Sequence, residues 1–164
     1  MSLKIQITRL IEGIGQSPEI LHELITSIPE SRLKQKLIPN KWSIHEHVCH
    51  LAMAEEMIIR RFRDFKDRPN PQFQSYQPND RSDYDKLMHL DMWNYLDRYK
   101  DIRHQTIELI KNFDARIWRK EATHEEYIDY SAFIFLRHVL MHDFFHMYRI
   151  EELALTKETH LKSE

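Results

Sequence analysis

The sequence predicts an all-α protein, a single domain in which long helices pack as a bundle. Only 2 of the 164 residues are glycine, which is too few for folds built from many tight turns or from phosphate-binding loops. Apolar residues recur at steps of three and four over long stretches, and no stretch shows a convincing β-hairpin pattern. Apolar residues make up 41% of the chain and charged residues 30%, so 1–164 has the composition of one globular domain.

The first two helices are marked by their start signals. The first, Leu3–Ile28, is expected to bend or break near Gly13–Gly15 and to restart at Ser17–Pro18, in the pattern of an N-cap followed by proline at the first helical position. The second, Ser43–Phe65, begins with a capping box, formed by a serine and a glutamate three residues later. Its apolar residues then follow steps of three and four.

A proline-rich connection, Asp67–Ser82, separates these helices from the rest, and it is either a crossover or a functional loop. The third helix is expected over Asp83–Asn112, and an irregular stretch over Asp114–Asp129. The last helix spans Tyr130–Leu155. Its apolar residues cover almost the whole circumference, which predicts burial on most sides.

The composition argues against several classes of protein. A net charge of −2, with both signs mixed along the chain, is not typical of a nucleic-acid-binding protein. No run of about 18 apolar residues is present that could span a membrane. The N-terminal stretch lacks the apolar core of a signal peptide, and the single cysteine, Cys49, can form no internal disulfide. We therefore expect a cytoplasmic protein that binds neither nucleic acid nor membrane.

The chain contains 11 histidines, and three of them share one face of the last helix. His138, His142 and His146 are four residues apart, and each step of four drifts by only about 40° around a helix. Two histidines at this spacing can bind one ion, but the outer pair is separated by roughly 12 Å of helix rise. A third ligand should come from another helix. Alternatively, these histidines are core residues with other hydrogen-bond partners.

The start of the second helix offers candidates for that third ligand. His45, His47 and His50 lie there, and the pattern alone does not choose among them. Cys49 adjoins His50, but neighbours on a helix point about 100° apart, so their side chains should not converge on one ion. A role for this cysteine as a small buried apolar residue is favoured over a role as ligand or nucleophile.

The stretch from His142 to His146 has the spacing of the zinc-protease motif HExxH, with Asp143 in place of the glutamate base. Aspartate is one methylene shorter, so peptide hydrolysis is not favoured. The sequence contains no nucleophile elbow, P-loop or dinucleotide-binding motif.

Two blocks of the sequence, in the right order, resemble the DinB/YfiT-like superfamily of metalloenzymes. In the first block, Lys41–Ile44 leads into His50–Ala52, similar to the pattern "kWS…HLa". In the second, His138 is followed by His142–His146 and then Ile150, similar to "H…HdxxHxxqI". The plan of helices also fits over most of the chain.

The resemblance implies that His50, His142 and His146 are the ligands of a divalent metal ion, with zinc or nickel most common in the superfamily. It also implies a four-helix bundle with a long second connection, often as a homodimer. Where activity is known, the superfamily includes metal-dependent transferases and isomerases that use low-molecular-weight thiols such as bacillithiol or mycothiol. We therefore expect a metal-dependent, thiol-using transferase or a hydrolase that acts on a small-molecule substrate. The alternative is a non-catalytic bundle for metal binding or dimerisation.

The sequence identifies no catalytic base. His138, Glu55 and Arg149 are candidates for contacts around the ion or the substrate. Arg149 departs from the superfamily, which often has glutamine at this position, so it bears on substrate preference. Helix position also suggests that a pocket beside the ion is lined partly by Trp42, Phe145 or Arg149.

Overall fold

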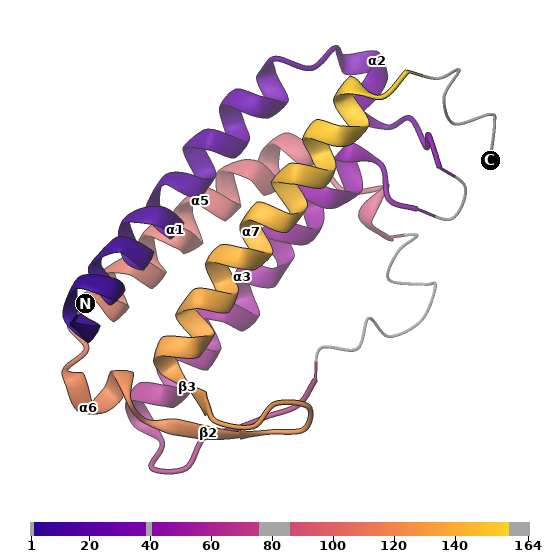
Figure 1. Cartoon of the computed structure of the whole chain (residues 1–164). Helices are drawn as coiled ribbons and strands as arrows, with labels where there is room; N and C mark the ends of the chain where they lie inside the picture. The colour runs from indigo at the N-terminus through magenta and orange to yellow at the C-terminus, as the bar shows by residue number, and fades with distance from the viewer. Residues whose placement is uncertain (1, 39–40, 76–85, 158–164) are drawn as a thin grey trace.

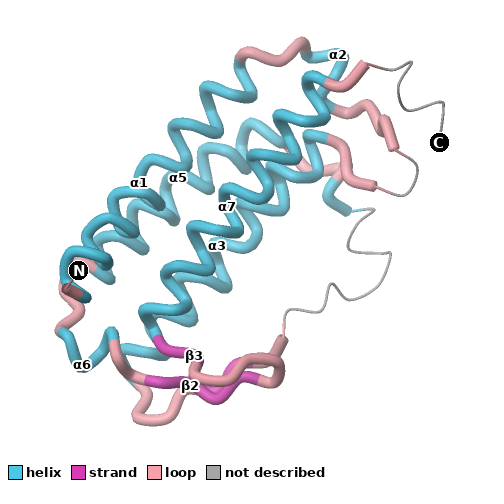
Figure 2. Tube along the Cα trace, in the orientation of Figure 1, coloured by secondary structure: helices cyan, strands magenta, loops and turns pink. Residues whose placement is uncertain are grey.

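Four long helices dominate the structure, a computed structural model that describes residues 2–38, 41–75 and 86–157. The long helices are α1 (Leu3–Thr26), α3 (Ile44–Asp67), α5 (Met92–Ile110) and α7 (Ala132–Leu155). The shorter elements are α2 (Glu30–Leu33), α6 (Ala115–Trp118), β1 (Gln72–Phe73), β2 (Glu121–His124) and β3 (Tyr130–Ser131). Figure 2 shows the long helices side by side, with the strands gathered at one end. The predicted four-helix bundle is confirmed.

The order of the helices around the bundle differs from a simple up-and-down arrangement. In Figure 1, α1 and α7 run in one direction and α3 and α5 run in the other. Both α1 and α3 pack against α5 and against α7. Because α3 and α5 are parallel neighbours, the end of α3 and the start of α5 lie at opposite ends of the bundle. The expected long second connection is therefore confirmed.

A bend or break was predicted near Gly13 with a restart at Pro18, and the break is wrong, because α1 is continuous through both residues. A proline inside a helix has no N–H for the carbonyl four residues earlier. Here that carbonyl, of Ile14, accepts a hydrogen bond from Nη1 of Arg103 at 2.9 Å. The glycine permits close packing, since a Cβ at Gly13 would lie 3.1 Å from the side chain of Leu140 on α7. A contact from a distant helix thus stabilises a proline that usually interrupts a helix.

The third long helix begins later than predicted. α5 starts after Asp91, whose Oδ1 accepts a hydrogen bond from the backbone N–H of Asn94 at 3.1 Å. Before it, the N–H of Leu90 donates to the carbonyl oxygen of Leu87 and closes a turn. The predicted start at Asp83 lies outside the described residues. The aspartate satisfies an N–H group of the first turn, so the helix begins there.

A small sheet closes one end of the bundle, and the expectation of no β-hairpin was wrong. β2 pairs in parallel with β1, with Gln72 opposite Thr123, and antiparallel with β3, with Glu121 opposite Ser131. β1 and β3 contain only two residues each, which is too short for an alternating apolar pattern to be seen in the sequence. Phe73 of β1 is buried and joins the sheet to the helical core.

Two apolar clusters fill the bundle. One lies toward α2 and includes Leu51 and Ile150, and the other lies toward the strands and includes Phe62 and Leu136. The residues that separate the two clusters along α3, α5 and α7 are charged and buried, with Arg103 in the centre. The middle of the bundle is therefore held by ion pairs.

The buried charges join all four long helices. Arg103 of α5 donates to Glu55 of α3 from Nε at 2.9 Å and from Nη2 at 2.5 Å. It also donates to Asp143 of α7 from Nη1 at 2.6 Å and from Nη2 at 3.1 Å. Its bond to the Ile14 carbonyl adds α1. Such a buried group of charges stabilises the fold only while all its members are present. Removing one partner destabilises the fold, because it leaves a buried charge uncompensated.

α7 is buried along one side only, contrary to the prediction. Phe144, Phe145 and Tyr148 are 49%, 58% and 66% exposed, and Met141 beside them is exposed as well. The apolar pattern could not separate the core face from this outer face, because both carry large apolar residues. Within the described residues, no helix is long and apolar enough to cross a bilayer.

Candidate metal centre

Three histidines converge between two antiparallel, neighbouring helices. His50 lies in the second turn of α3, and His142 and His146 lie on successive turns of α7. Nε2 of His50 is 3.2 Å from Nε2 of His142, and one nitrogen from each of the three rings lies within 4.8 Å of the others. The structure therefore brings together the three residues proposed as ligands from the sequence, and their role as ligands stays a prediction.

The spacing of the nitrogens fits a tetrahedral ion. Bonds of about 2.0–2.1 Å place the ligand nitrogens of such an ion roughly 3.3 Å apart. The 3.2 Å between His50 and His142 matches this value. Among the described residues, no further His, Cys, Asp or Glu joins the group. Three protein ligands would leave a fourth position for a water or a substrate atom, as in catalytic zinc sites.

Burial keeps the three rings neutral. It is the largest cause that lowers the pKa of His50 to about 3 and that of His146 to about 2, and the neighbouring histidines lower both further. Burial likewise lowers the pKa of His142. A neutral imidazole is the form that binds a metal ion, so no proton has to be removed at neutral pH.

Two residues near the start of α3, Trp42 and His47, contact these rings. The Trp42 ring lies 4.6 Å from that of His50 and 5.7 Å from that of His146, measured between centroids. Nδ1 of His47 lies 2.8 Å from Nδ1 of His146. With Nε2 of His146 bound to an ion, its Nδ1–H would donate to His47, which fixes the orientation of the ring. The resemblance left His47 outside the ligand set, and nothing in the sequence indicated this contact.

The other residues of that helix start do not join the group. Nε2 of His45 lies 3.1 Å from the backbone oxygen of Leu87, which ties α3 to the segment before α5. Cys49 is fully buried in the apolar core, and burial raises its pKa to about 12. Its thiol therefore stays protonated and is no nucleophile at neutral pH. The favoured interpretation of Cys49 as a buried apolar residue agrees with this position.

Two carboxylates considered from the sequence, Asp143 and Glu55, bind Arg103 inside the core. Asp143, at the position of the HExxH base, is fully buried and bound by Arg103. Glu55, suggested as a contact around the ion or substrate, is bound by the same guanidinium. Neither is free to accept a proton from a substrate. Asp143 instead anchors the turn of α7 that carries His142.

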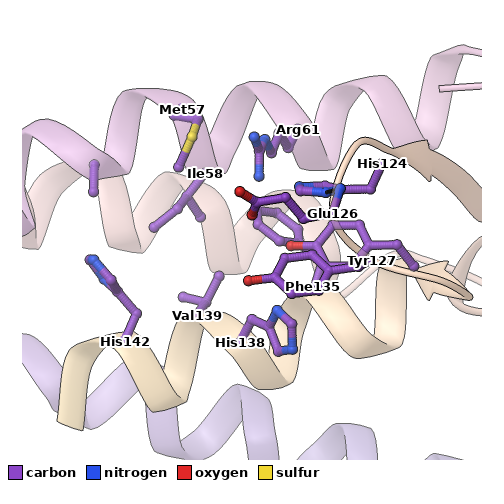
Figure 3. Close-up of a pocket in the computed structure, with 12 residues that line it drawn as sticks. Met57, Ile58, Arg61, His124, Glu126, Tyr127, Phe135, His138, Val139 and His142 are labelled. Atoms are coloured by element: carbon purple, nitrogen blue, oxygen red, sulfur yellow. Dashed lines mark hydrogen bonds between the residues drawn. The ribbon is translucent and has the colours of Figure 1, made fainter. Parts of the chain in front are cut away.

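A cavity of about 190 Å³ opens beside His142. Figure 3 shows His142 at one end of it, with His138 one turn away on α7. Arg61 of α3 and two tyrosines of the β2–β3 segment, Tyr127 and Tyr130, also line it. His138 was suggested from the sequence, whereas Arg61 and the tyrosines were not, and Tyr127 lies in a stretch that was expected to be irregular.

The pocket lining suggested from helix position is not the lining of this cavity. Trp42, Phe145 and Arg149 do not border it. The Phe145 ring lies 5.2 Å from that of His146 but is largely exposed on the outer face of α7. Arg149 pairs with Glu152 on its own helix.

A sequence profile of the DinB superfamily matches residues 14–150. The chain belongs to the DinB superfamily. The matched region includes α3 and the part of α7 that carries the histidines. No curated protein matches the chain at a significant level.

Among solved structures, this DinB-superfamily chain is similar to YfiT from Bacillus subtilis, described as a probable metal-dependent hydrolase with an unusual four-helix bundle topology. The TM-score is 0.79 at 18% sequence identity, and the match covers 93% of this chain and 87% of that one. At this identity the likeness shows that the two proteins share a fold.

The lowered pKa values predict that the metal-free DinB chain loses stability on acidification. Unfolded histidines titrate near pH ~6.5, so below that pH the unfolded state takes up protons that the buried rings of His50 and His146 do not. The free energy of unfolding should therefore fall, by up to about 1.4 kcal/mol per pH unit for each ring. Urea unfolding of chelator-treated protein between about pH 7 and about pH 5, on either side of the reference value, measures this slope. His50→Gln should make it shallower, and a stability that rises toward acid would contradict the prediction.

Proposed function

We propose that the protein is a divalent-metal-dependent enzyme that acts on a small molecule. The observation that carries this proposal is the convergence of His50, His142 and His146, of which His142 also lines the cavity, with no fourth side chain in the group among the described residues. A structural metal site is usually closed by a fourth protein ligand, whereas a catalytic site keeps one position open toward a pocket. Zinc and nickel are the ions we favour, because neutral imidazoles suit both.

A divalent ion held by three imidazoles supplies positive charge that lowers the pKa of a bound water or thiol and so activates it as a nucleophile. Side chains around the three histidines would shape the site of such an ion. Trp42 packs on two of the rings and covers them on one side. His138 lines the cavity one turn from His142, and burial lowers its pKa, so that its neutral ring can accept a proton at neutral pH. We infer that His138 is the residue placed for proton transfer.

The reaction we favour is transfer of a low-molecular-weight thiol to an electrophilic substrate, with hydrolysis as the second candidate. Cys49 cannot supply the thiol, because it is buried and its pKa is raised to about 12. A thiol would therefore enter as a cosubstrate. Hydrolysis is supported by the description of YfiT as a probable metal-dependent hydrolase. A cytoplasmic location would suit a thiol-using enzyme with one reduced cysteine.

Cobalt substitution separates these candidates. Titration of the cobalt-loaded protein with small thiols should give a saturable charge-transfer band, because a thiolate would occupy the open position. The band should persist in Cys49→Ala and disappear in His142→Ala. If no thiol gives a band but ester or amide hydrolysis depends on the metal, the hydrolase candidate replaces the transferase. If neither is observed and a side chain completes the coordination, the site is structural and the non-catalytic bundle is correct.

We also expect the protein to be a homodimer. The outer face of α7 exposes Met141, Phe144, Phe145 and Tyr148 next to one another along the helix, an apolar surface that the bundle itself does not cover. Sedimentation at micromolar concentration should give twice the chain mass of 20.1 kDa. Phe144→Lys, which places a charge in that face, should shift the protein to monomers. A wild-type monomer would contradict the prediction.

A further inference from the structure

We propose that the cavity beside His142 binds a small carboxylate-bearing molecule, and that Arg61 is the residue that recognises its carboxylate. This proposal rests on the proposed function for its meaning, since it defines the class of substrate that such an enzyme would accept. It names a residue of α3 that is not part of the histidine group and that the matching blocks of the sequence do not include.

The cavity has the size and the polarity for such a ligand. At about 190 Å³ it is smaller than the roughly 300–1,000 Å³ typical of sites for drug-sized molecules. Ile58 and Val139 make an apolar wall near His142, while the polar side chains gather at the far end around Arg61 (Figure 3). A ligand with a polar group at Arg61 and an apolar body would therefore extend toward the histidines.

Arg61 is held in place at that end. Its guanidinium carbon lies 5.0 Å from the centroid of the Phe73 ring and 5.8 Å from that of Phe135. Nη2 donates a hydrogen bond to the backbone oxygen of Gln74 at 2.6 Å. These contacts orient a planar group that has five N–H donors, of which a carboxylate can take two in parallel. The arginine is thus positioned before any ligand arrives.

The charge of Arg61 is not matched by a carboxylate of the chain. Within the described residues, no aspartate or glutamate oxygen lies in ion-pair distance of it, whereas Arg98 and Arg103 both have such partners. Arg61 is half-buried, so its charge has lost part of its hydration, and this burial lowers its pKa. An anionic ligand would restore a partner to this charge, and a carboxylate fits its geometry best.

One acidic residue, Glu126, shares the cavity and provides a matched test. It lies on the turn after β2, and its backbone N–H donates to Nδ1 of His124. Its carboxylate is not paired with Arg61, so it would repel an anionic ligand. Removing the charge of Glu126 should therefore strengthen the binding of an anion, while it would weaken the binding of a ligand that also carries an ammonium group.

Benzoate and its neutral isostere benzamide test the proposal on the full-length chain, both as purified and after chelation. Titration followed by NMR should show benzoate binding that perturbs the side-chain Nε–H of Arg61, with or without metal. Arg61→Met should weaken it about tenfold or more, as expected for a charged hydrogen-bond pair, and benzamide should bind comparably weakly to wild type. Arg61→Lys, which keeps the charge but not the paired donors, should lose less. Glu126→Gln should bind benzoate at least as tightly as wild type.

The outcomes separate this proposal from the metal-dependent function. His142→Ala should lose metal but keep benzoate binding, because Arg61 lies at the other end of the cavity. Absence of metal from wild type, together with Arg61-dependent benzoate binding, would contradict the proposed function and leave the carboxylate site standing. Benzoate binding that is equal in Arg61→Met and wild type, that occurs only with metal present, or that is matched by benzamide would overturn the carboxylate site. Circular dichroism and urea unfolding of the two Arg61 variants verify that they are folded.

Discussion

We expect the wild-type protein to carry about one divalent ion per chain, and His142→Ala and His146→Ala should each lose almost all of it. Each variant removes one of only three nitrogens that converge within 4.8 Å. Because no other described side chain joins the group, nothing replaces the missing ligand. Elemental analysis after dialysis, and competition with a chelator for the affinity, measure the effect. We expect a loss of more than about 100-fold in affinity, beyond the roughly 10–100-fold that is typical when a partner of a ligand is removed.

Three other histidines of the chain provide control substitutions for this prediction. His45→Ala should keep its metal, because its ring contacts the backbone of Leu87 and not the histidine group. His138→Ala, one turn before His142 on the same helix, should also keep it. The metal affinity of His47→Ala should lie between that of these controls and that of the ligand variants, since Nδ1 of His47 lies 2.8 Å from Nδ1 of His146. Full retention of metal in both His142→Ala and His146→Ala would show that the ligands lie elsewhere.

Arg103→Met should destabilise the fold by about 3–5 kcal/mol, the range for breaking a buried ion pair by removing one partner. The variant leaves the carboxylates of Glu55 and Asp143 buried without a counter-charge, and the Ile14 carbonyl without its donor. Burial already raises the pKa of Glu55, and the positive charge of Arg103 is what opposes that shift. Urea unfolding, monitored by circular dichroism, gives the change in the free energy of unfolding.

A second ion pair between the same helices provides the comparison. Nη2 of Arg98 lies 2.6 Å from Oε1 of Glu56, but both side chains are exposed. Arg98→Met should therefore cost less than about 1 kcal/mol, as surface pairs usually do. In Arg103→Met, adding Glu55→Gln and Asp143→Asn should restore part of the stability, because the uncompensated charges are removed. If Arg103→Met costs no more than Arg98→Met, the buried group does not hold the bundle together.

The start of α3 shows what local sequence determines. Ser43 and Glu46 form the predicted capping box, with the serine Oγ accepting from the N–H of Glu46 and the glutamate accepting from the N–H of Ser43. The helix that carries His50 therefore begins where the pattern placed it. The spacing of His142 and His146 likewise set both on one face of α7, since a step of four nearly completes a turn. These features depend on residues within one or two turns of each other.

The glycines and the proline of α1 show where local reasoning failed. Gly13 and Pro18 indicated a break, because within one segment they destabilise a helix. The structure keeps the helix intact with a donor from Arg103, which is 89 residues away from Ile14 in the chain. A pattern confined to the segment contains no information on that partner.

The sequence by itself determined the helices and the faces on which the histidines lie, because helix periodicity and capping act between residues a few positions apart. Only the tertiary structure decided which polar side chains serve the core and which line the cavity. Asp143 sits beside a candidate ligand in the sequence, yet it packs inward onto Arg103, while Arg61 is turned into the cavity beside Tyr130. The reason is that a side chain's environment depends on the helices and strands packed against it, and that packing is fixed by contacts between residues far apart in the chain.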